Sequence, residues 1–134
     1  MARDRRLGFQ SKPLLISIIV TNHNYARFLG QCLDSVMAQT YAAVECIVVD
    51  DGSTDESRDV IGRYPAVKAI FQANVGQAIA AKNGLRHATG DVVLFLDSDD
   101  FLFADACKEV ARNWTDGLVA FHFRLQIVRN GVFE

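Results

Sequence analysis

The sequence predicts an α/β protein in which a mostly parallel, Rossmann-like sheet carries helices on both faces. Short runs of Leu, Ile and Val, typical of strands buried on both faces, alternate with segments of helical periodicity. Four such strand–helix units follow one another, which implies right-handed crossovers between parallel strands. Polar clusters follow three of the strands, at the sheet edge where ligands bind in open α/β folds.

The first unit begins with residues 14–21, a continuous apolar run that predicts a buried strand. We expect this strand to end at the polar cluster that follows it. Phe28, Cys32 and Val36 then recur at helical spacing, so we expect an amphipathic helix over residues 26–39.

The second unit begins with a strand over residues 44–49, which stops at an acidic, glycine-containing cluster. A helix that carries Val60 and Ile61 is expected next. Ser53 or Thr54 is expected to cap its N-terminus, because a hydroxyl oxygen can accept a hydrogen bond from a free backbone N–H group there.

The third and fourth units extend over residues 67–113. Residues 67–71 predict a short strand, and residues 76–88 predict a helix with a narrow face of small residues that permits close packing. Residues 92–96 predict the fourth strand and residues 103–113 the fourth helix.

The end of the chain predicts further strands. Residues 118–123 and 125–128 have the composition of strands, and Asn130-Gly131 predicts a hairpin turn between the second of these and Val132-Phe133. Exposed apolar strands near this end can pair between copies, so self-association is a hypothesis.

The domain organisation is expected to be simple, with a flexible N-terminal arm at residues 1–13 and one globular domain at residues 14–134. The chain balances 14 Lys and Arg against 16 Asp and Glu, and half of its 134 residues are hydrophobic. This composition excludes intrinsic disorder, and a near-neutral charge argues against a nucleic-acid partner.

The apolar runs and the cysteines indicate the cellular location. The longest apolar runs are much shorter than the roughly 20 residues of a membrane-spanning helix, so no such segment is expected. The three cysteines, Cys32, Cys46 and Cys107, are widely spaced and are expected to be buried, reduced thiols. We therefore expect a cytoplasmic protein, with the inner face of the membrane as the alternative for a full-length protein.

Asp97-Ser98-Asp99, which follows the fourth strand, brings two carboxylates close together. Two such charges about 4 Å apart repel by roughly 4 kcal/mol at an effective dielectric of about 20, so a cation is expected between them. Oxygen ligands with no nearby His or Cys suit Mg²⁺ or Mn²⁺. The structural alternative is a solvated turn with a capping Asp.

Asp50 and Asp51 form a second acidic pair, and Gly52 after them allows a ligand to approach the backbone closely. A carboxylate here can accept a hydrogen bond from a base N–H or a ribose hydroxyl group. The alternative is a turn with a helix cap.

Two further groups of residues are weaker candidates. Gly76, with Lys82, Asn83 and Gly84, can bring an amide and a cation near a pyrophosphate, although helix packing with Lys82 in solvent is the favoured explanation. His23 follows the first strand, but a single His without a partner is more often structural than functional.

As a set, four ordered motifs resemble the family 2 glycosyltransferases with the GT-A fold. The resemblance covers about residues 14–124, and a lone D-x-D would be far less specific. The motifs are IIVTNHN (18–24), VVDDGSTD (48–55), NVG (74–76) with AKNG (81–84), and DSDD (97–100).

The resemblance implies transfer of a sugar from a nucleoside diphosphate, with UDP first among candidates, usually with inversion, to a saccharide, lipid or protein acceptor. The cellular context it implies is cell-envelope polysaccharide biosynthesis. It also implies that Asp97 and Asp99 hold Mn²⁺ or Mg²⁺ between the two phosphates. The implied nucleotide-sugar residues are Thr21, Asn22, Asn24, Tyr25, Asp50, Asp51, Gly76, Lys82, Asn83, Asp97 and Ser98.

The sequence departs from the family pattern in two ways. Residues 101–104 replace a stretch that usually contains proline, which affects a local turn. Family members also continue for about as long again, and that half supplies the acceptor cleft and the general base. The chain is therefore expected to be a truncated, donor-binding half of a glycosyltransferase, without a catalytic base and inactive alone.

Three other functions are weighed against this one. The main alternative is a non-catalytic sugar-nucleotide-binding or scaffolding domain. A phosphoacceptor signalling domain is also a small doubly wound sheet, but its acidic pair is expected after the first strand and here it follows the second. A dinucleotide-binding oxidoreductase would need a G-x-G-x-x-G motif after the first strand, which this sequence lacks.

Overall fold

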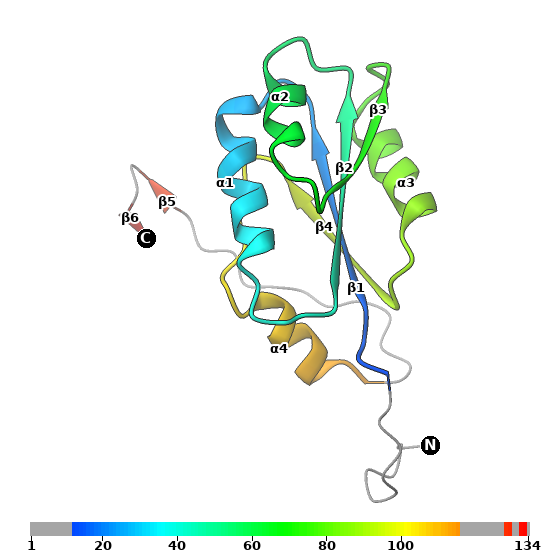
Figure 1. Ribbon diagram of the computed structural model, residues 1–134, viewed down its shortest axis with the longest axis vertical. Coiled ribbons are helices and arrows are strands. Elements are labelled where there is room, and N and C mark those ends of the chain that lie inside the picture. Colours follow the sequence, from blue (N-terminus) through cyan, green and yellow to red (C-terminus); the bar gives the residue numbers. More distant parts are fainter. Residues whose placement is uncertain (1–11, 116–127, 130–131, 134) are drawn as a thin grey trace, which may run out of the picture.

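The main sheet confirms the predicted parallel topology. The computed structural model describes residues 12–115, 128–129 and 132–133. Its four-stranded parallel sheet has the order β3–β2–β1–β4. The strands are β1 (Ile16–Asn22), β2 (Val44–Asp51), β3 (Lys68–Gln72) and β4 (Val92–Asp97) (Figure 1).

Four helices connect or follow these strands, as predicted, and most of their bounds lie close to the expected ones. Helix α4 begins at Ala106 rather than at residue 103, because residues 104–105 form a turn in which the Ala106 N–H group donates to the Phe103 carbonyl over 3.0 Å. The helices are α1 (Ala26–Met37), α2 (Ser57–Gly62), α3 (Gln77–His87) and α4 (Ala106–Asn113).

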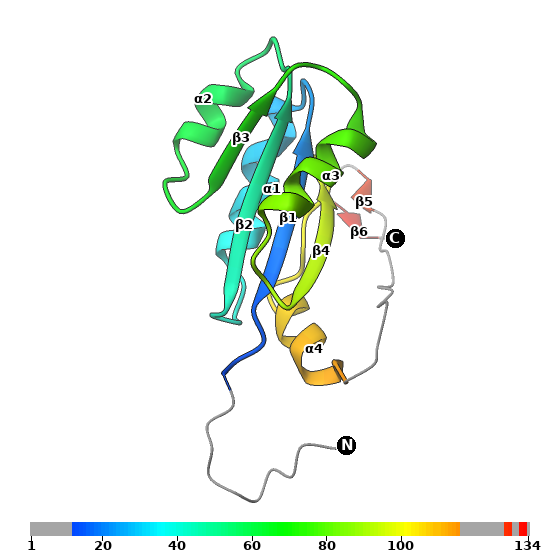
Figure 2. The same cartoon turned by 90° about the vertical axis from the view of Figure 1, so that its right-hand side faces the viewer.

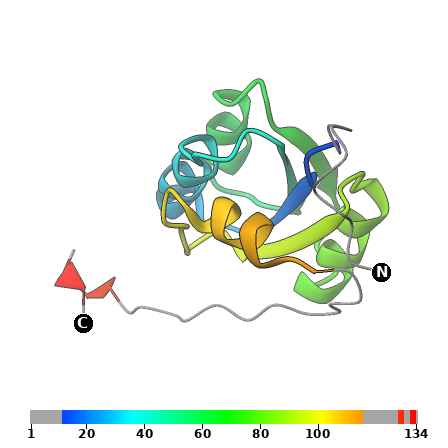
Figure 3. The same ribbon diagram turned by 90° about the horizontal axis from the view of Figure 1, so that it is seen from below.

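The helices cover both faces of the sheet because side chains alternate along each strand. On β1, Ile18 belongs to the larger apolar core, which α1, α2 and α4 cover, whereas Ile19 belongs to a smaller core under α3. Figures 1 and 2 show α1 and α2 on the opposite side of the sheet from α3, and Figure 3 shows the same layers from below. Strands β1 and β2 are buried on both faces, as their continuous apolar runs predict.

The close packing predicted for the third helix is confirmed at Gly84. A Cβ atom at this position would lie 2.5 Å from Ile19 Cγ2 and 3.1 Å from Val49 Cγ2. Ala80, one turn earlier, is also buried against the sheet. Small residues on this face therefore bring α3 directly onto β1 and β2.

The cap predicted for the second helix was wrong. Helix α2 begins at Ser57, and Glu56 at its N-cap makes no side-chain capping bond. Asp55 instead accepts a hydrogen bond from the Ser57 N–H group over 3.0 Å and from the Ala26 N–H group at the start of α1 over 2.9 Å. One carboxylate thus stabilises the beginnings of two helices. A helix N-terminus carries partial positive charge, so a negative side chain is favourable at both positions.

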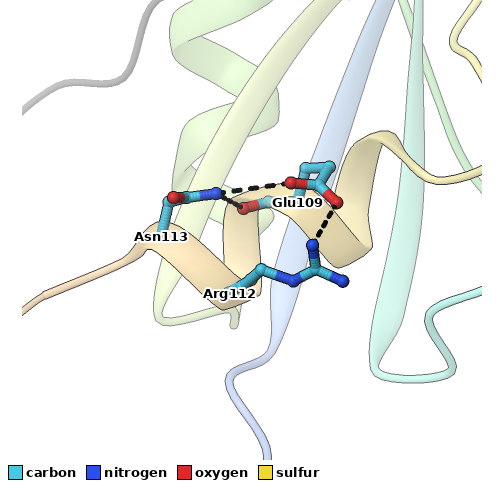
Figure 4. A network of polar contacts seen from close by, with 3 residues as sticks. All are labelled: Glu109, Arg112 and Asn113. Carbon is cyan, nitrogen blue, oxygen red and sulfur yellow. Dashed lines mark hydrogen bonds and ion pairs between the residues drawn. The ribbon is translucent and has the colours of Figure 1, made fainter.

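Helix α4 is amphipathic and ends in a small polar network (Figure 4). Arg112 Nη1 lies 3.1 Å from Glu109 Oε1, and Asn113 Nδ2 donates to the Glu109 carbonyl over 2.8 Å. Because the ion pair is exposed, it contributes little to stability. The buried face of α4 carries Cys107 and Val110.

The cysteines are buried and free, as predicted for reduced thiols. Burial raises the pKa of Cys32 and of Cys46 to about 12, and that of Cys107 to about 11. Thiols with such values stay protonated near neutral pH and are poor nucleophiles.

The predicted C-terminal hairpin is seen in part. β5 (Val128–Arg129) pairs antiparallel with β6 (Val132–Phe133), with Val128 opposite Phe133. The strand predicted over residues 118–123, most of the one predicted over 125–128, and residues 1–11 of the arm predicted over residues 1–13 lie outside the described residues. Among the helices that the structure describes, none has the length and apolar character needed to cross a bilayer.

Candidate donor-binding site

A pocket lies at the carboxyl ends of β1, β2 and β4, next to the start of α3. The polar clusters predicted after the first, second and fourth strands all contribute to it, so Asp51 and Asp97 face the same pocket. Its lining residues are Thr21, Asn22, His23, Tyr25, Asp51, Gln77, Ala80, Asp97, Ser98 and Asp99.

Asp51 is held in place by backbone and side-chain donors. It is 4% exposed and accepts hydrogen bonds from the Val75 N–H group (2.8 Å), the Gly76 N–H group (2.9 Å) and Gln72 Nε2 (2.9 Å). Burial alone would raise the pKa of this carboxyl group, but these donors and the nearby His23 ring lower it below its usual value. Asp51 is therefore an ionised acceptor fixed at the pocket wall.

Asp50, the neighbouring candidate, has a different environment. It is fully buried and is not among the pocket-lining residues. Asp50 Oδ1 accepts hydrogen bonds from Asn22 Nδ2 over 2.9 Å and from Ser53 Oγ over 2.6 Å. Its carboxylate joins the ends of β1 and β2 from inside the fold.

Asn22 lines the pocket from the end of β1. Its side chain is 2% exposed, and Nδ2 donates to Asp50 and to Ser53 Oγ, the latter over 3.2 Å. Among the described residues, Asn22 Oδ1 is the one buried side-chain polar atom without a hydrogen-bond partner. A buried acceptor without a hydrogen-bond partner is uncommon in a folded protein. The end of β1 therefore offers the pocket an acceptor atom whose hydrogen-bonding capacity is unused.

Asn24 acts as a clamp between two loops and is not among the pocket-lining residues. Its backbone is left-handed, with φ at +56°, which Asn tolerates better than most residues. Asn24 Oδ1 accepts hydrogen bonds from the N–H groups of Thr54 (2.7 Å) and Asp55 (3.3 Å), and its own N–H donates to Ser53 Oγ (2.9 Å). The adjacent Tyr25 does line the pocket.

The three candidates at or just before α3, Gly76, Lys82 and Asn83, have different surroundings. Gly76 precedes the helix with φ at +103°, and its N–H group reaches Asp51. Asn83 Nδ2 donates to Gln72 Oε1 over 2.8 Å, so Asn83 supports Asp51 indirectly through Gln72. Lys82 is exposed on the helix and does not line the pocket.

The acidic cluster at the end of β4 consists of Asp97, the last residue of that strand, and of Asp99 and Asp100. Each offers a carboxylate oxygen, and these oxygens lie within 4.8 Å of one another. Burial, followed by the negative charges of Asp99 and Asp97, raises the pKa of Asp100. Ser98, between the first two, is 2% exposed and lines the pocket. The cluster concentrates negative charge at the pocket rim.

Two polar lining residues, His23 and Gln77, are absent from the nucleotide-sugar residues implied by the resemblance. His23 was a weaker candidate for which a structural role was favoured, and Gln77 was not among the candidates. The Asp51 carbonyl, 2.7 Å from His23 Nδ1, can only accept a hydrogen bond, so Nδ1 carries the hydrogen. Asn24 Nδ2 lies 3.3 Å and Asn74 Nδ2 3.4 Å from His23 Nε2, which therefore accepts. The sequence signals that could have marked them are that His23 lies within the IIVTNHN motif (18–24) and that Gln77 directly follows the NVG motif (74–76).

This arrangement defines the class of protein: an α/β protein with a polar pocket where its parallel strands end, the place at which open α/β folds bind ligands. The family model for glycosyl transferase family 2 matches residues 17–132. The chain therefore belongs to glycosyl transferase family 2, as its motifs predicted, and it has the GT-A fold of the structures that it resembles.

Known relatives support the same assignment. An uncharacterized glycosyltransferase of Nostoc sp. is 52% identical over 90 residues, which are 63% of this chain and 28% of the relative. A crystal structure of S. aureus TarS in complex with UDP-GlcNAc is 29% identical, with a TM-score of 0.71, over 74% of this chain and 30% of that one. The chain thus spans about a third or less of these relatives.

A mannosyltransferase from Pyrobaculum calidifontis, in complex with GDP-Man and Mn²⁺, is also similar, with 29% identity and a TM-score of 0.67 over 75% of this chain and 33% of that one. The residues of the present chain fit such a cation. Asp97, Asp99 and Asp100 offer only carboxylate oxygens, the ligands that hard divalent cations prefer.

Proposed function

We propose that this chain forms the donor side of a metal-dependent, inverting glycosyltransferase whose donor is a nucleoside diphosphate sugar, with UDP as the first candidate. The observation that carries the proposal is the shared pocket of Asp51 and Asp97. One carboxylate is buried and hydrogen-bonded, and the other lies in an exposed acidic cluster. These two environments suit two different parts of one ligand.

Asp51 is proposed to accept a hydrogen bond from the base or ribose of the nucleotide. Its three donors, from Gln72, Val75 and Gly76, hold it ionised and rigid. A fixed acceptor loses little conformational freedom when ligand binds, so it favours affinity and selectivity. Tyr25 and His23 line the same pocket and supply aromatic surface beside it.

Asp97 and Asp99 are proposed to hold Mn²⁺ or Mg²⁺ against the diphosphate. When bound, the cation would neutralise the leaving diphosphate as the glycosidic bond breaks, a Lewis-acid role worth several kcal/mol at the transition state. Inversion also requires a base within hydrogen-bond reach of the acceptor hydroxyl, which typically contributes about 10²–10⁴-fold. We propose that the base and the acceptor cleft come from the further length that the relatives have.

The test is nucleotide binding by this chain, followed as thermal stabilisation on titration with UDP or GDP, with and without Mn²⁺. A nucleotide at about 100 times its dissociation constant should stabilise the fold by about 2.7 kcal/mol. We expect this gain to require Mn²⁺ and to be lost in Asp99→Asn. The matched control is Asp59→Asn, which removes an exposed carboxylate on α2, away from the pocket-lining residues.

Two results would contradict the proposal. Equal stabilisation by the nucleotide with and without Mn²⁺ would contradict the proposed metal dependence. If wild type and Asp59→Asn are both folded but neither is stabilised by a nucleoside diphosphate, the proposed binding of a nucleoside diphosphate sugar is contradicted.

A further inference from the structure

Gln77 connects two walls of the pocket. It is the first residue of α3, and its Nε2 atom donates to Asp97 Oδ1 over 2.5 Å and to Thr21 Oγ1 over 3.4 Å. These contacts join the start of α3 to the ends of β1 and β4. A single amide group therefore reaches across the pocket to a carboxylate of the acidic cluster.

The position of Gln77 is set by Asp51. The N–H groups of Val75 and Gly76, directly before Gln77, both donate to the Asp51 carboxylate. Gly76 adopts a φ of +103°, a conformation that glycine reaches without strain, and so turns the chain into α3. The bonds to Asp51 thus fix the point from which the Gln77 side chain reaches Asp97.

The hydrogen bond from Gln77 Nε2 to Asp97 Oδ1 places partial positive charge beside the acidic cluster. Among the residues that the structure describes, Gln77 is the only side chain that donates a hydrogen bond to a carboxylate of the cluster formed by Asp97, Asp99 and Asp100. An amide N–H group can satisfy a carboxylate oxygen, but it repels a cation. The same oxygen cannot hold the Gln77 hydrogen and a metal ion in the same direction at the same time.

We propose that Gln77 is a positioning residue that holds Asp97 toward the pocket and competes with the divalent cation for Asp97 Oδ1. This inference rests on the proposed function, because the cation is that of the donor site. Cation binding breaks the Nε2–H···Oδ1 hydrogen bond and releases the amide group. Gln77 thereby weakens cation binding in the absence of the donor. The orientation of its side chain differs between the cation-free and the cation-bound site.

The test measures Mn²⁺ affinity of the nucleotide-free chain by isothermal titration calorimetry and by the electron paramagnetic resonance of free Mn²⁺. Gln77→Ala removes the competing donor, and we expect Mn²⁺ to bind about three- to tenfold more tightly, the range for one net hydrogen bond. Gln77→Lys places a permanent cation beside Asp97, so Mn²⁺ binding should weaken by at least as much. Gln31→Ala, which changes an exposed glutamine on α1, is the control and should leave the affinity unchanged.

The opposite directions of the two variants separate competition from a merely structural role, because a loss of fold would weaken binding in both. Unchanged or weaker Mn²⁺ binding by Gln77→Ala, including no binding at all, would overturn the inference. If UDP still stabilised the chain in a Mn²⁺-dependent way, the proposed function would stand. Tighter Mn²⁺ binding by Gln77→Ala without any response to nucleotides would instead overturn the proposed function and support the competition.

Discussion

The backbone N–H group of Gly76 donates a hydrogen bond to Asp51 Oδ2 over 2.9 Å, so the end of β2 holds the turn that leads into α3. The second carboxylate oxygen binds the preceding N–H group, of Val75, and the Gln72 side chain. Asp51 is consequently both a pocket wall and the anchor of the helix that carries Gln77. Its removal should affect stability and ligand binding together.

Asp51→Asn tests this double role. The substitution keeps the shape of the side chain but replaces one acceptor oxygen by an NH₂ group, which faces a backbone N–H donor. We expect a loss of about 1–3 kcal/mol in the free energy of unfolding, because a buried donor is left without a partner. Urea unfolding followed by circular dichroism measures this loss, and a titration with UDP and Mn²⁺ should show weakened binding in parallel. Wild-type stability with weakened UDP binding would show that Asp51 does not anchor the turn.

Gly84→Ala tests the contact between α3 and the sheet. The added methyl group would meet Ile19 Cγ2 at 2.5 Å and Val49 Cγ2 at 3.1 Å, both on buried β-branched side chains with little freedom to move. Overpacking typically costs about 1–3 kcal/mol and outweighs the gain of up to about 1 kcal/mol in helix propensity. We therefore expect a lower midpoint of thermal unfolding.

The matched control is Gly62→Ala at the end of α2, where an added Cβ has no neighbour within 4 Å. This change should leave the unfolding midpoint unchanged or raise it slightly, because alanine restricts the unfolded chain. Equal effects of the two substitutions would indicate that helix propensity, and not packing against Ile19, decides the outcome.

The fold and the convergence of the acidic clusters could be predicted because both follow from local pattern and parallel topology. Once buried strands alternate with helices, residues after the strands must meet at one edge, which brings Asp51 and Asp97 together. Which of two adjacent residues faces the pocket could not be predicted. Asp50 and Asp51 are consecutive on β2, and their side chains point in opposite directions.

Gln77 and Asp55 show a second limit of sequence patterns. The partners of Gln77, Thr21 and Asp97, are brought to it only by tertiary folding. Asp55 bonds both Ala26, far along the chain, and Ser57, two residues on, so a local capping rule that favours Ser53 or Thr54 misses it. The bond to Ser57 is local, and a capping rule that included Asp55 could have found it. The bond to Ala26 and the partners of Gln77 carry no local signal.

The acid stability of the chain should depend on carboxylates with lowered pKa values. Burial alone would raise the pKa of Glu45, but hydrogen bonds from Ser17, Thr89 and Gly90 bring it below the ordinary value of 4.5. Such a group stabilises the fold at pH above its unfolded value, and that stability is lost as the pH falls through the lower folded value. Asp51 and Asp55, with an ordinary pKa of 3.8, act in the same direction. Unfolding free energy should therefore be constant near neutral pH and fall below about pH 4.

Glu45→Gln separates this contribution from the general effect of acid. The amide cannot titrate, so the variant should be less stable than wild type at neutral pH and should approach it as the pH falls. Urea unfolding at a series of pH values measures the difference. A constant difference at every pH would contradict the lowered pKa of Glu45.

The Asn24 clamp should control the geometry of the β1 loop at the pocket. Asn24→Ala loses the acceptor for the Thr54 and Asp55 N–H groups and also places alanine at a φ of +56°. Asn24→Gly loses the acceptor and the Nδ2 contact with His23 but tolerates the backbone, whereas Asn24→Asp keeps both the acceptor and a residue that tolerates this backbone. We expect stability to decrease in the order wild type, Asp, Gly, Ala, with about 1–3 kcal/mol lost in the alanine variant. Because Asn22 and His23 of the same loop line the pocket, UDP affinity measured with Mn²⁺ should fall in the same order. An alanine variant as stable as the glycine variant would show that the left-handed backbone carries no cost at this position.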